Sequence, residues 1–383
     1  MFSILFFILL PLILAILLKF NMPPLASVKS WSPFKIDALG IVTLLGADAV
    51  RKSLGRLTYS PFEYFPLLAG HIFADNSVAD PIPGFILYNI TEGMKATDLS
   101  AWFTRWLLCQ KVTYSATKLK ITGTTRGREP TSHHSRARTI ALVLNSFLII
   151  WPLLSSDWYG SVASFSLVGL VAVRIWTLRA MRQSLDANFE QASSATKSSP
   201  VNLFISLPTG ERITVTTTTG ITQDCLLTEA RPKSSWNHMI AQTIAWVAFG
   251  IHVVSLGMAC LAVQLALLIS TLACSVAVVR CWWSEGWNSE EHRLGSRMVI
   301  KRSDTSGVQS MAKMYVLLGL NDEEEQNMVD WSLIPTRSSR LWLPTYRQFK
   351  EDARHDPSVL DTWGNRLRQA YEDDERAQAA AAL

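Results

Sequence analysis

Long apolar blocks separated by charged stretches dominate the hydrophobic pattern of this chain. The first block, residues 1–20, has about the length that a bilayer core requires, and no charge precedes Lys19. A signal peptide would need a positively charged start, a shorter apolar core and a cleavage site of small residues, which this block lacks. We therefore expect an uncleaved anchor helix, which Pro11 would kink.

Two further blocks, residues 140–154 and 161–178, flank the short polar stretch SSDWYG. Two apolar runs joined by a polar turn predict a helical hairpin, which we place at 139–178. Trp158 and Tyr159 within the turn are typical of the boundary between membrane and water.

A second hairpin is expected at 238–279, because these 42 residues contain no Asp, Glu, Lys or Arg. At 1.5 Å per residue, a single helix of this length would be about twice as long as a bilayer core. We predict two helices with a turn near residues 255–257. Trp236 before the pair, and Trp282 and Trp283 after it, indicate a shared interface.

Positive charge gathers at one end of each hairpin. Residues 21–138 hold 14 Lys and Arg against 8 Asp and Glu, and Arg179 and Arg280 follow the two hairpins. Cytoplasmic loops carry the excess of Lys and Arg, and a basic stretch beside an apolar block favours a membrane surface over nucleic acid. We predict three cytoplasmic parts, with no nucleic-acid partner: 21–138, 179–237 and 280–383.

The first cytoplasmic part, 21–138, is expected to be folded close to the membrane. A helix running through Trp102 and Trp106 could lie in the membrane interface or pack its tryptophans into a core. The sequence Asn89-Ile90-Thr91 is the one N-glycosylation sequon, and a cytoplasmic location predicts that it is unused.

Three runs rich in β-branched residues occupy residues 201–229, with turn signals between them. They predict a small antiparallel β-meander that must pack on another segment, since three strands alone are marginally stable. The acidic tail, 280–383, is expected to be mostly helical, with helix starts at Asn321 and at Asp356-Pro357.

The predicted fold class is therefore mainly α: a multi-pass α-helical membrane protein with cytoplasmic α+β segments. One anchor helix and two hairpins would cross the bilayer, and the C-terminus would be cytoplasmic. The membrane itself is left open, because nothing in the pattern distinguishes one organelle from another.

Candidate chemistry outside the apolar blocks is sparse. His133 and His134 are adjacent rather than spaced as zinc ligands are, and we expect no metal. His71, Asp75 and Asp80 could do acid–base work, although a solvated loop is the simpler interpretation. The five cysteines form no C-x-x-C pair, and the familiar nucleotide-binding, zinc-protease and hydrolase motifs are absent from the sequence, so we predict no cofactor.

Polar side chains inside the apolar blocks are costly and therefore informative. Asn145 and Arg174 would reach similar depth in the first hairpin, where they could pair, or Arg174 could extend to the lipid headgroups. His252 and Gln264 would lie at similar depth near the turn of the second hairpin. A structural hydrogen bond is the expected role of the second pair.

Three functions are compatible with this pattern. The leading hypothesis is a non-catalytic membrane protein that holds its cytoplasmic segments at the bilayer to bind a protein partner. The first alternative is a small-molecule transporter or channel that uses the four intramembrane polar residues. The second is a membrane enzyme acting on a lipid or apolar metabolite.

Overall fold

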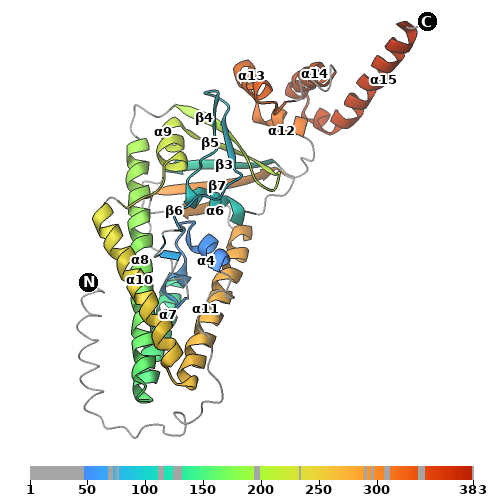
Figure 1. Ribbon diagram of the computed structural model, residues 1–383. Coiled ribbons are helices and arrows are strands. Elements are labelled where there is room, and N and C mark those ends of the chain that lie inside the picture. The colour runs from blue at the N-terminus through green and yellow to red at the C-terminus, as the bar shows by residue number, and fades with distance from the viewer. Residues whose placement is uncertain are drawn as a thin grey trace.

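A bundle of long helices continues into a mixed β-sheet, which carries further helices on its other side (Figure 1). This arrangement comes from a computed structural model. It describes residues 47–67, 72–73, 75, 77–110, 116–123, 132–193, 199–232, 234–288, 291–294, 297–305, 311–334 and 341–381. The predicted anchor helix at 1–20 lies outside the described residues.

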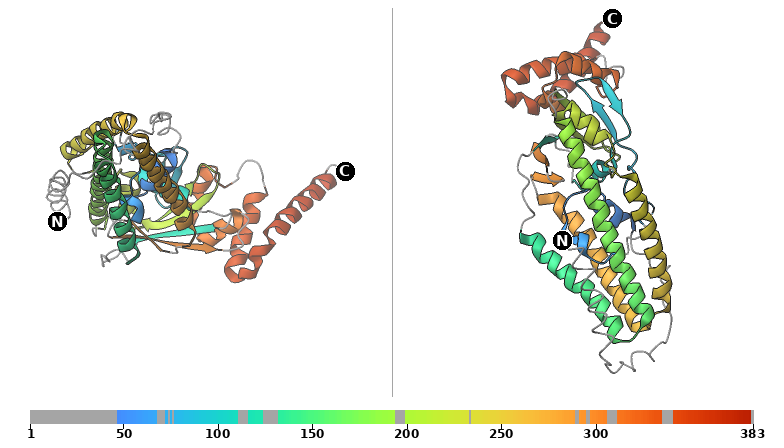
Figure 2. Two further views of the ribbon diagram at one scale, coloured as in Figure 1. Left: turned by 90° about the horizontal axis from the view of Figure 1, so that it is seen from below. Right: turned by 90° about the vertical axis from the view of Figure 1, so that its left-hand side faces the viewer.

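Four helices form the bundle: α7 (Ser132–Leu154), α8 (Trp158–Ala192), α10 (Ser235–Met258) and α11 (Leu261–Asn288). Three of them are long and apolar enough to cross a membrane, and α7 contributes a shorter apolar stretch, Arg138–Leu154. The break between α10 and α11 falls after Met258, slightly later than the sequence predicted. The second half of α8 extends beyond the bundle to the level of the sheet, as the right-hand view of Figure 2 shows.

Seven strands form one sheet in the order β2-β1-β4-β5-β3-β7-β6. The pair β3/β5 is parallel and all other pairs are antiparallel. The strands are β1 (Ile86–Asn89), β2 (Met94–Ala96), β3 (Ala116–Gly123), β4 (Pro200–Ser206), β5 (Arg212–Thr218), β6 (Glu291–Leu294) and β7 (Met298–Thr305).

The predicted β-meander at 201–229 is only partly correct. Its first two runs form the hairpin β4/β5, but the third run forms α9 (Thr219–Ile221) and the π-helical turn η3 (Thr222–Leu227). Thr218 begins this helix by accepting a hydrogen bond from the Ile221 amide. A helical turn buries Ile221, Cys225 and Leu226 together, which an alternating strand could not do.

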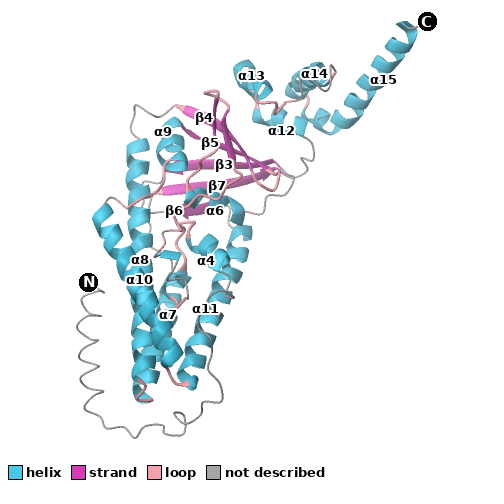
Figure 3. Cartoon of the chain, in the orientation of Figure 1, coloured by secondary structure: helices cyan, strands magenta, loops and turns pink. Residues whose placement is uncertain are grey.

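Strands outside 201–229 were not predicted, so β6 and β7 are additions to a tail whose described residues are otherwise mostly helical, as expected. The short alternation in β3 places Leu119 and Ile121 in the core while Lys120 is exposed. In β7, Met298 and Ile300 point into the same core. The sheet therefore joins segments that are far apart in the sequence, and Figure 3 shows it between the two groups of helices.

One face of the sheet packs on α4 (Ala47–Leu54), α6 (Ala101–Cys109) and the upper parts of α8 and α11. Trp102 and Trp106 are almost fully buried in this core, beside Leu178 and Cys274 from the long helices. The structure thus decides between the two interpretations of the tryptophan helix, since α6 is a core element.

The other face carries α12 (Met311–Leu318), α13 (Asp322–Asp330), α14 (Trp342–His355), η4 (Pro357–Thr362) and α15 (Trp363–Ala381). Tyr88 and Phe204 from the sheet pack against Tyr315, Tyr346 and Phe349, which form a second core. The predicted helix start at Asn321 is confirmed, because Asn321 and Glu324 form a reciprocal capping box. The mainly helical character of the chain is confirmed as well.

Candidate functional site

Exposed apolar side chains are concentrated on the four bundle helices. Representative members are Leu142, Phe147, Val162, Trp246, Val254 and Ile269. Among described residues elsewhere, only Tyr59, Met94 and Tyr371 are large hydrophobic side chains of comparable exposure. We call this surface of α7, α8, α10 and α11 the apolar belt.

The length of the apolar belt along the helix axes follows from the packing of α8 against α10. Ala163 contacts His252, and Leu170 packs beside Ala245, so the two helices run antiparallel. Extending this register places Trp236 level with Arg179, and Met258 level with Asp157. The 22 residue steps from Trp236 to Met258 span about 33 Å, close to the thickness of a bilayer core.

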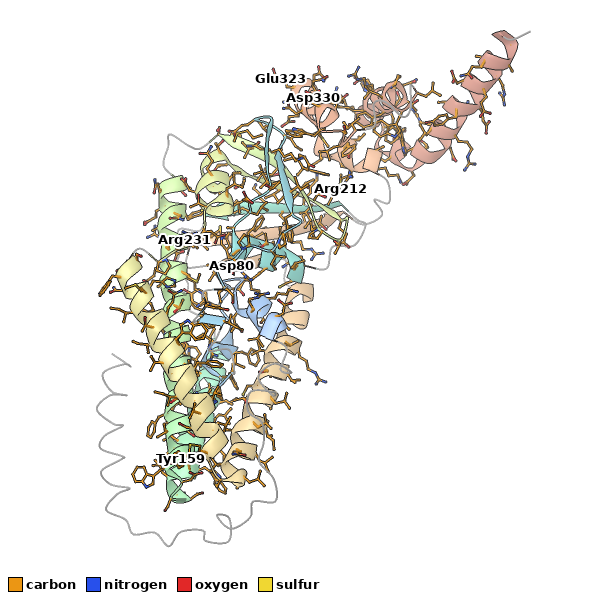
Figure 4. All side chains as sticks on the ribbon, in the orientation of Figure 1. Asp80, Tyr159, Arg212, Arg231, Glu323 and Asp330 are labelled. Atoms are coloured by element: carbon orange, nitrogen blue, oxygen red, sulfur yellow. The ribbon has the colours of Figure 1, made fainter. Side chains whose placement is uncertain are left out.

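The two ends of the belt differ in charge. Trp158 and Tyr159 occupy the end far from the sheet, where Tyr159 is seen at the tip of the bundle (Figure 4). The charged residues labelled in that figure, among them Asp80 and Arg231, all lie on the side of the sheet. Arg138 of α7 and Arg179 and Arg182 of α8 lie at the boundary between the apolar belt and the sheet side of the molecule.

A short segment, residues 57–65, packs between α7 and α8 at this boundary, and we call it the clamped loop. It contains the 3₁₀ turn η1 (Pro61–Tyr64), which begins with a capping box between Ser60 and Glu63. Ser60 accepts from the Phe62 amide, and the Glu63 carboxylate accepts from the Ser60 amide at 3.1 Å. The sequence Ser-Pro-Phe-Glu has this capping signature.

Asn145 and Arg174, the predicted inner pair, both donate to the clamped loop. Asn145 Nδ2 donates to the carbonyl of Tyr64 at 2.9 Å. Arg174 donates twice to the carbonyl of Glu63, at 2.8 and 3.1 Å, and also to that of Phe65. Arg174 is buried, so its guanidinium contacts backbone carbonyls rather than the headgroup region.

Arg182, about two helical turns beyond Arg174 on α8, completes the clamp. Its guanidinium donates to the carbonyls of Leu57 and Thr58, at 2.9 and 2.8 Å, and forms a buried ion pair with the Glu63 carboxylate. The ring of Tyr59 covers it, with 4.4 Å from Cζ to the ring centroid. Burial raises the pKa of Tyr59, although the charge of Arg182 opposes this shift.

Two more arginines converge on Tyr64 from the outside. The Cζ atom of Arg138, on α7, lies 5.2 Å from the centroid of the Tyr64 ring. Arg179 Nη2, on α8, donates to the Tyr64 hydroxyl at 3.4 Å. Both arginines are exposed and Tyr64 is half-buried, so the three side chains form a basic surface at the upper edge of the belt.

His252 and Gln264, the predicted outer pair, contact backbone rather than each other. His252 Nδ1 lies 2.8 Å from the carbonyl oxygen of Ala163, which joins α10 to α8. Gln264 Nε2 donates to the carbonyls of Leu256 and Ala259, both at 3.0 Å, and so satisfies the end of α10. Both side chains therefore join backbone groups of the bundle helices and their turn.

Of the suspected acid–base group, Asp75 and Asp80 lie within the described residues. The Asp75 carboxylate accepts from the Ser77 amide at 2.9 Å in a local turn, and the side chains of Asp75 and Asp80 are exposed. His71 lies outside the described residues, as do the side chains of His133 and His134. Within the described part of the chain, no group of three His, Cys, Asp or Glu residues could hold a metal ion.

The turn at 77–80 is held by Arg105, a buried arginine of α6. Its guanidinium donates to the carbonyls of Ser77, Val78 and Asp80, at 2.8, 2.6 and 2.8 Å. Burial lowers the pKa of Arg105 to about 10, with a further contribution from nearby Arg51. The group still carries its charge at neutral pH, and its contacts are structural.

The C-terminal helices are fastened to the sheet by a polar network. Glu324 Oε1 accepts from the Thr91 hydroxyl at 2.8 Å and from Asn202 Nδ2 at 3.2 Å. Asn327 donates to the carbonyl of Ile90 at 2.8 Å. Asn89 of the sequon is buried, and its side-chain amide donates to Glu92.

Sequence analysis did not identify Glu63 and Arg182 as partners in the clamp, nor Tyr64 as the contact of Arg138 and Arg179. The capping signature around Ser60 could have located the loop, but it does not show which helix receives Glu63. Comparison of the chain with protein-family models, curated proteins and solved structures finds no match. The class of the protein therefore has to be argued from its own geometry.

Proposed function

We propose that this chain is a multi-pass membrane protein in which α7, α8, α10 and α11 cross the bilayer as two hairpins. The apolar belt carries this proposal. Soluble proteins rarely expose contiguous apolar surface of this extent, whereas lipid tails cover it at little cost. Trp236 at the start of α10 and Trp158 at the start of α8 lie at opposite ends of the belt, a placement typical of interfacial tryptophans.

We further propose that the sheet and the C-terminal helices face the cytoplasm. Arg138, Arg179 and Arg182 gather at the sheet end of the belt, and 239–279 and 139–173 contain no Lys or Arg. The bias of Lys and Arg toward cytoplasmic ends supports this orientation. The burial of Asn89 also agrees with an unused sequon.

The role that these features favour is non-catalytic: the hairpins hold a folded platform at the bilayer, where it binds a protein partner. The surface we assign to the partner is α15. Its side chains are exposed almost throughout after Leu367, and the helix extends away from the sheet (Figure 1). Residues 372–375 are all acidic, so a partner with a basic surface would be steered toward this helix.

Membrane insertion is tested by extraction of the membrane fraction with alkaline carbonate. The chain should stay with the lipid and dissolve only in detergent. Orientation is tested in sealed vesicles with the cytoplasmic face outward, where protease should remove a C-terminal tag without permeabilisation. Release by carbonate would reject insertion, and protection of the tag would reject the orientation.

Partner binding is tested by truncation after Leu367. A deletion of 284–383 would remove β6 and β7 from the sheet and would confound binding with folding. The shorter truncation leaves the second core in place, because Trp363 and Leu367 are retained. Cross-linking in membranes should yield a specific adduct with the full chain and none with the truncated chain.

A charge variant provides the matched control. Substituting Gln for Glu372, Asp373, Asp374 and Glu375 keeps the helix and removes its acidic patch. We expect the adduct to weaken strongly and to become insensitive to salt. An adduct of equal yield from the full, truncated and neutralised chains would reject α15 as the binding surface.

A further inference from the structure

Arg138, Arg179 and Tyr64 form a cationic surface whose purpose the clamp does not explain. Arg174 and Arg182 are buried and spend their hydrogen bonds on the clamped loop. Arg138 and Arg179 are exposed, and they contact the ring and the hydroxyl of the same tyrosine, respectively. They contact the loop through the half-exposed side chain of Tyr64.

The local charge around Tyr64 is positive. The nearest acidic side chain of the clamped loop, Glu63, is already paired with Arg182. Asp186 follows Arg179 by seven residues along α8, which places it about 10 Å farther from the belt. An anion approaching from the bilayer side would therefore meet Arg138 and Arg179 first.

The depth of the surface identifies the anion. Arg179 is level with Trp236, where the apolar belt ends, and a phospholipid places its phosphate at this height. Guanidinium groups bind phosphate oxygens in a bidentate manner. The Tyr64 hydroxyl accepts from Arg179, so its own proton can be donated to a phosphate oxygen.

We propose that Arg138, Arg179 and Tyr64 bind the phosphate of an anionic phospholipid in the cytoplasmic leaflet. The bound headgroup would neutralise two positive charges beside the clamped loop. It would thereby link the lipid composition of the membrane to the packing of this loop between α7 and α8. The proposal rests on the proposed membrane insertion.

The test measures lipid binding to the full chain purified in a neutral detergent, by native mass spectrometry. Phosphatidylglycerol and phosphatidylcholine are titrated against the wild-type chain and against the R138Q/R179Q variant. The wild-type chain should prefer phosphatidylglycerol. Each arginine near an anionic surface contributes about fivefold in affinity, so the double variant should bind it about 25-fold more weakly.

Two further variants separate the site from general charge. R354Q/R376Q removes two exposed arginines from α14 and α15 and should leave binding unchanged. Y64F keeps both arginines and should weaken phosphatidylglycerol binding by about tenfold or more, the contribution of one hydrogen bond to a charged group. Equal binding of both lipids, or an equal loss in R354Q/R376Q, would overturn the proposal.

Inorganic phosphate distinguishes the source of the phosphate group. At millimolar concentration it should not displace phosphatidylglycerol, because it lacks acyl chains that cover the belt. Full displacement would show a site for soluble phosphate and would reject the lipid assignment. Failure of membrane insertion is seen separately, as release of the chain by carbonate.

Discussion

The carboxylate of Asp157 accepts a hydrogen bond from the backbone amide of Cys260, with 2.7 Å between Oδ2 and N. Its other oxygen, Oδ1, accepts from the backbone amide of Gly160 at 3.1 Å. Gly160 lies in the first turn of α8, and Cys260 directly precedes α11. One carboxylate thus satisfies amide groups at the beginnings of two helices and ties the two hairpin turns together.

Replacing Asp157 by Ala should therefore destabilise the bundle more than the loss of an ordinary cap. Two amides lose their acceptor, and we expect about 2–4 kcal/mol in the free energy of unfolding. The measurement is thermal or denaturant unfolding of the detergent-purified chain. D157N, which retains one acceptor oxygen, should fall between the wild type and D157A.

Ser234→Ala is the matched control for this prediction. Ser234 caps only α10, through one bond to the Asn237 amide at 3.3 Å, and its loss should cost about 1 kcal/mol. A D157A variant no less stable than S234A would contradict the bridging role of Asp157.

The ion pair between Glu63 and Arg182 provides the second prediction. Both side chains are almost completely buried, at 5% and 3% exposure. E63Q leaves the Arg182 charge without its partner, so we expect a loss of about 3–5 kcal/mol. Unfolding midpoints, compared with that of the wild type, measure the effect.

An exposed pair provides the comparison for E63Q. Glu190 and Arg297 also form an ion pair, but their side chains are 56% and 48% exposed. E190Q should change stability by less than about 1 kcal/mol because water screens this pair. Similar effects of E63Q and E190Q would show that the clamped loop does not depend on the buried charge.

The apolar hairpins could be predicted from the sequence because their signal is local. A run without charges identifies a buried or lipid-facing helix regardless of its neighbours. The helix start at Asn321 was predictable for the same reason, since its capping partner is three residues away. Helix ends were less predictable: α8 continues to Ala192 because its polar second half packs on the sheet.

The sheet and the clamp could not be predicted because their partners are distant in the sequence. The strand β3 pairs with β5 and β7, and each strand contributes only a short alternation. Arg174 lies 111 residues from the carbonyl of Glu63 that it binds. An arginine near the end of an apolar block has the same local pattern whether it extends to headgroups or binds a buried loop.

The close approach of Gly55 to Arg105 leads to a third prediction. A Cβ atom at Gly55 would lie 2.6 Å from Arg105 Cδ and 3.0 Å from the Arg51 carbonyl oxygen. G55A should displace the guanidinium that holds 77–80 and cost about 1–3 kcal/mol. Hydrogen exchange of 77–80, measured by mass spectrometry, should accelerate.

Gly364 is the control for the third prediction. It lies in α15, and a Cβ atom there would meet nothing within 4 Å. G364A should be neutral or stabilise by up to about 1 kcal/mol, because Ala is the better helix former. Unchanged exchange at 77–80 in G55A would mean that the Arg105 contacts tolerate the methyl group.

The last prediction concerns the pH dependence of the C-terminal helices. Glu325 is buried between α13 and α14, where Lys350 donates to it at 2.8 Å and Arg347 at 3.1 Å. Burial alone would raise the pKa of this carboxyl. The hydrogen bonds and charges of Lys350 and Arg347 outweigh burial, so its pKa lies below the ordinary value of 4.5.

A folded-state pKa below the unfolded value stabilises the fold only where the carboxyl is ionised. The contribution of Glu325 is therefore present in full at pH values above 4.5 and is lost as the pH falls through its folded-state pKa. Hydrogen exchange of α13 and α14 should accelerate over this acidic range, after correction for the intrinsic rate. In the E325Q variant, the amides of α13 and α14 should exchange faster at neutral pH than in the wild type. Their exchange should also lose its dependence on pH over the acidic range. Identical acid profiles of E325Q and the wild type would assign the transition to other carboxylates.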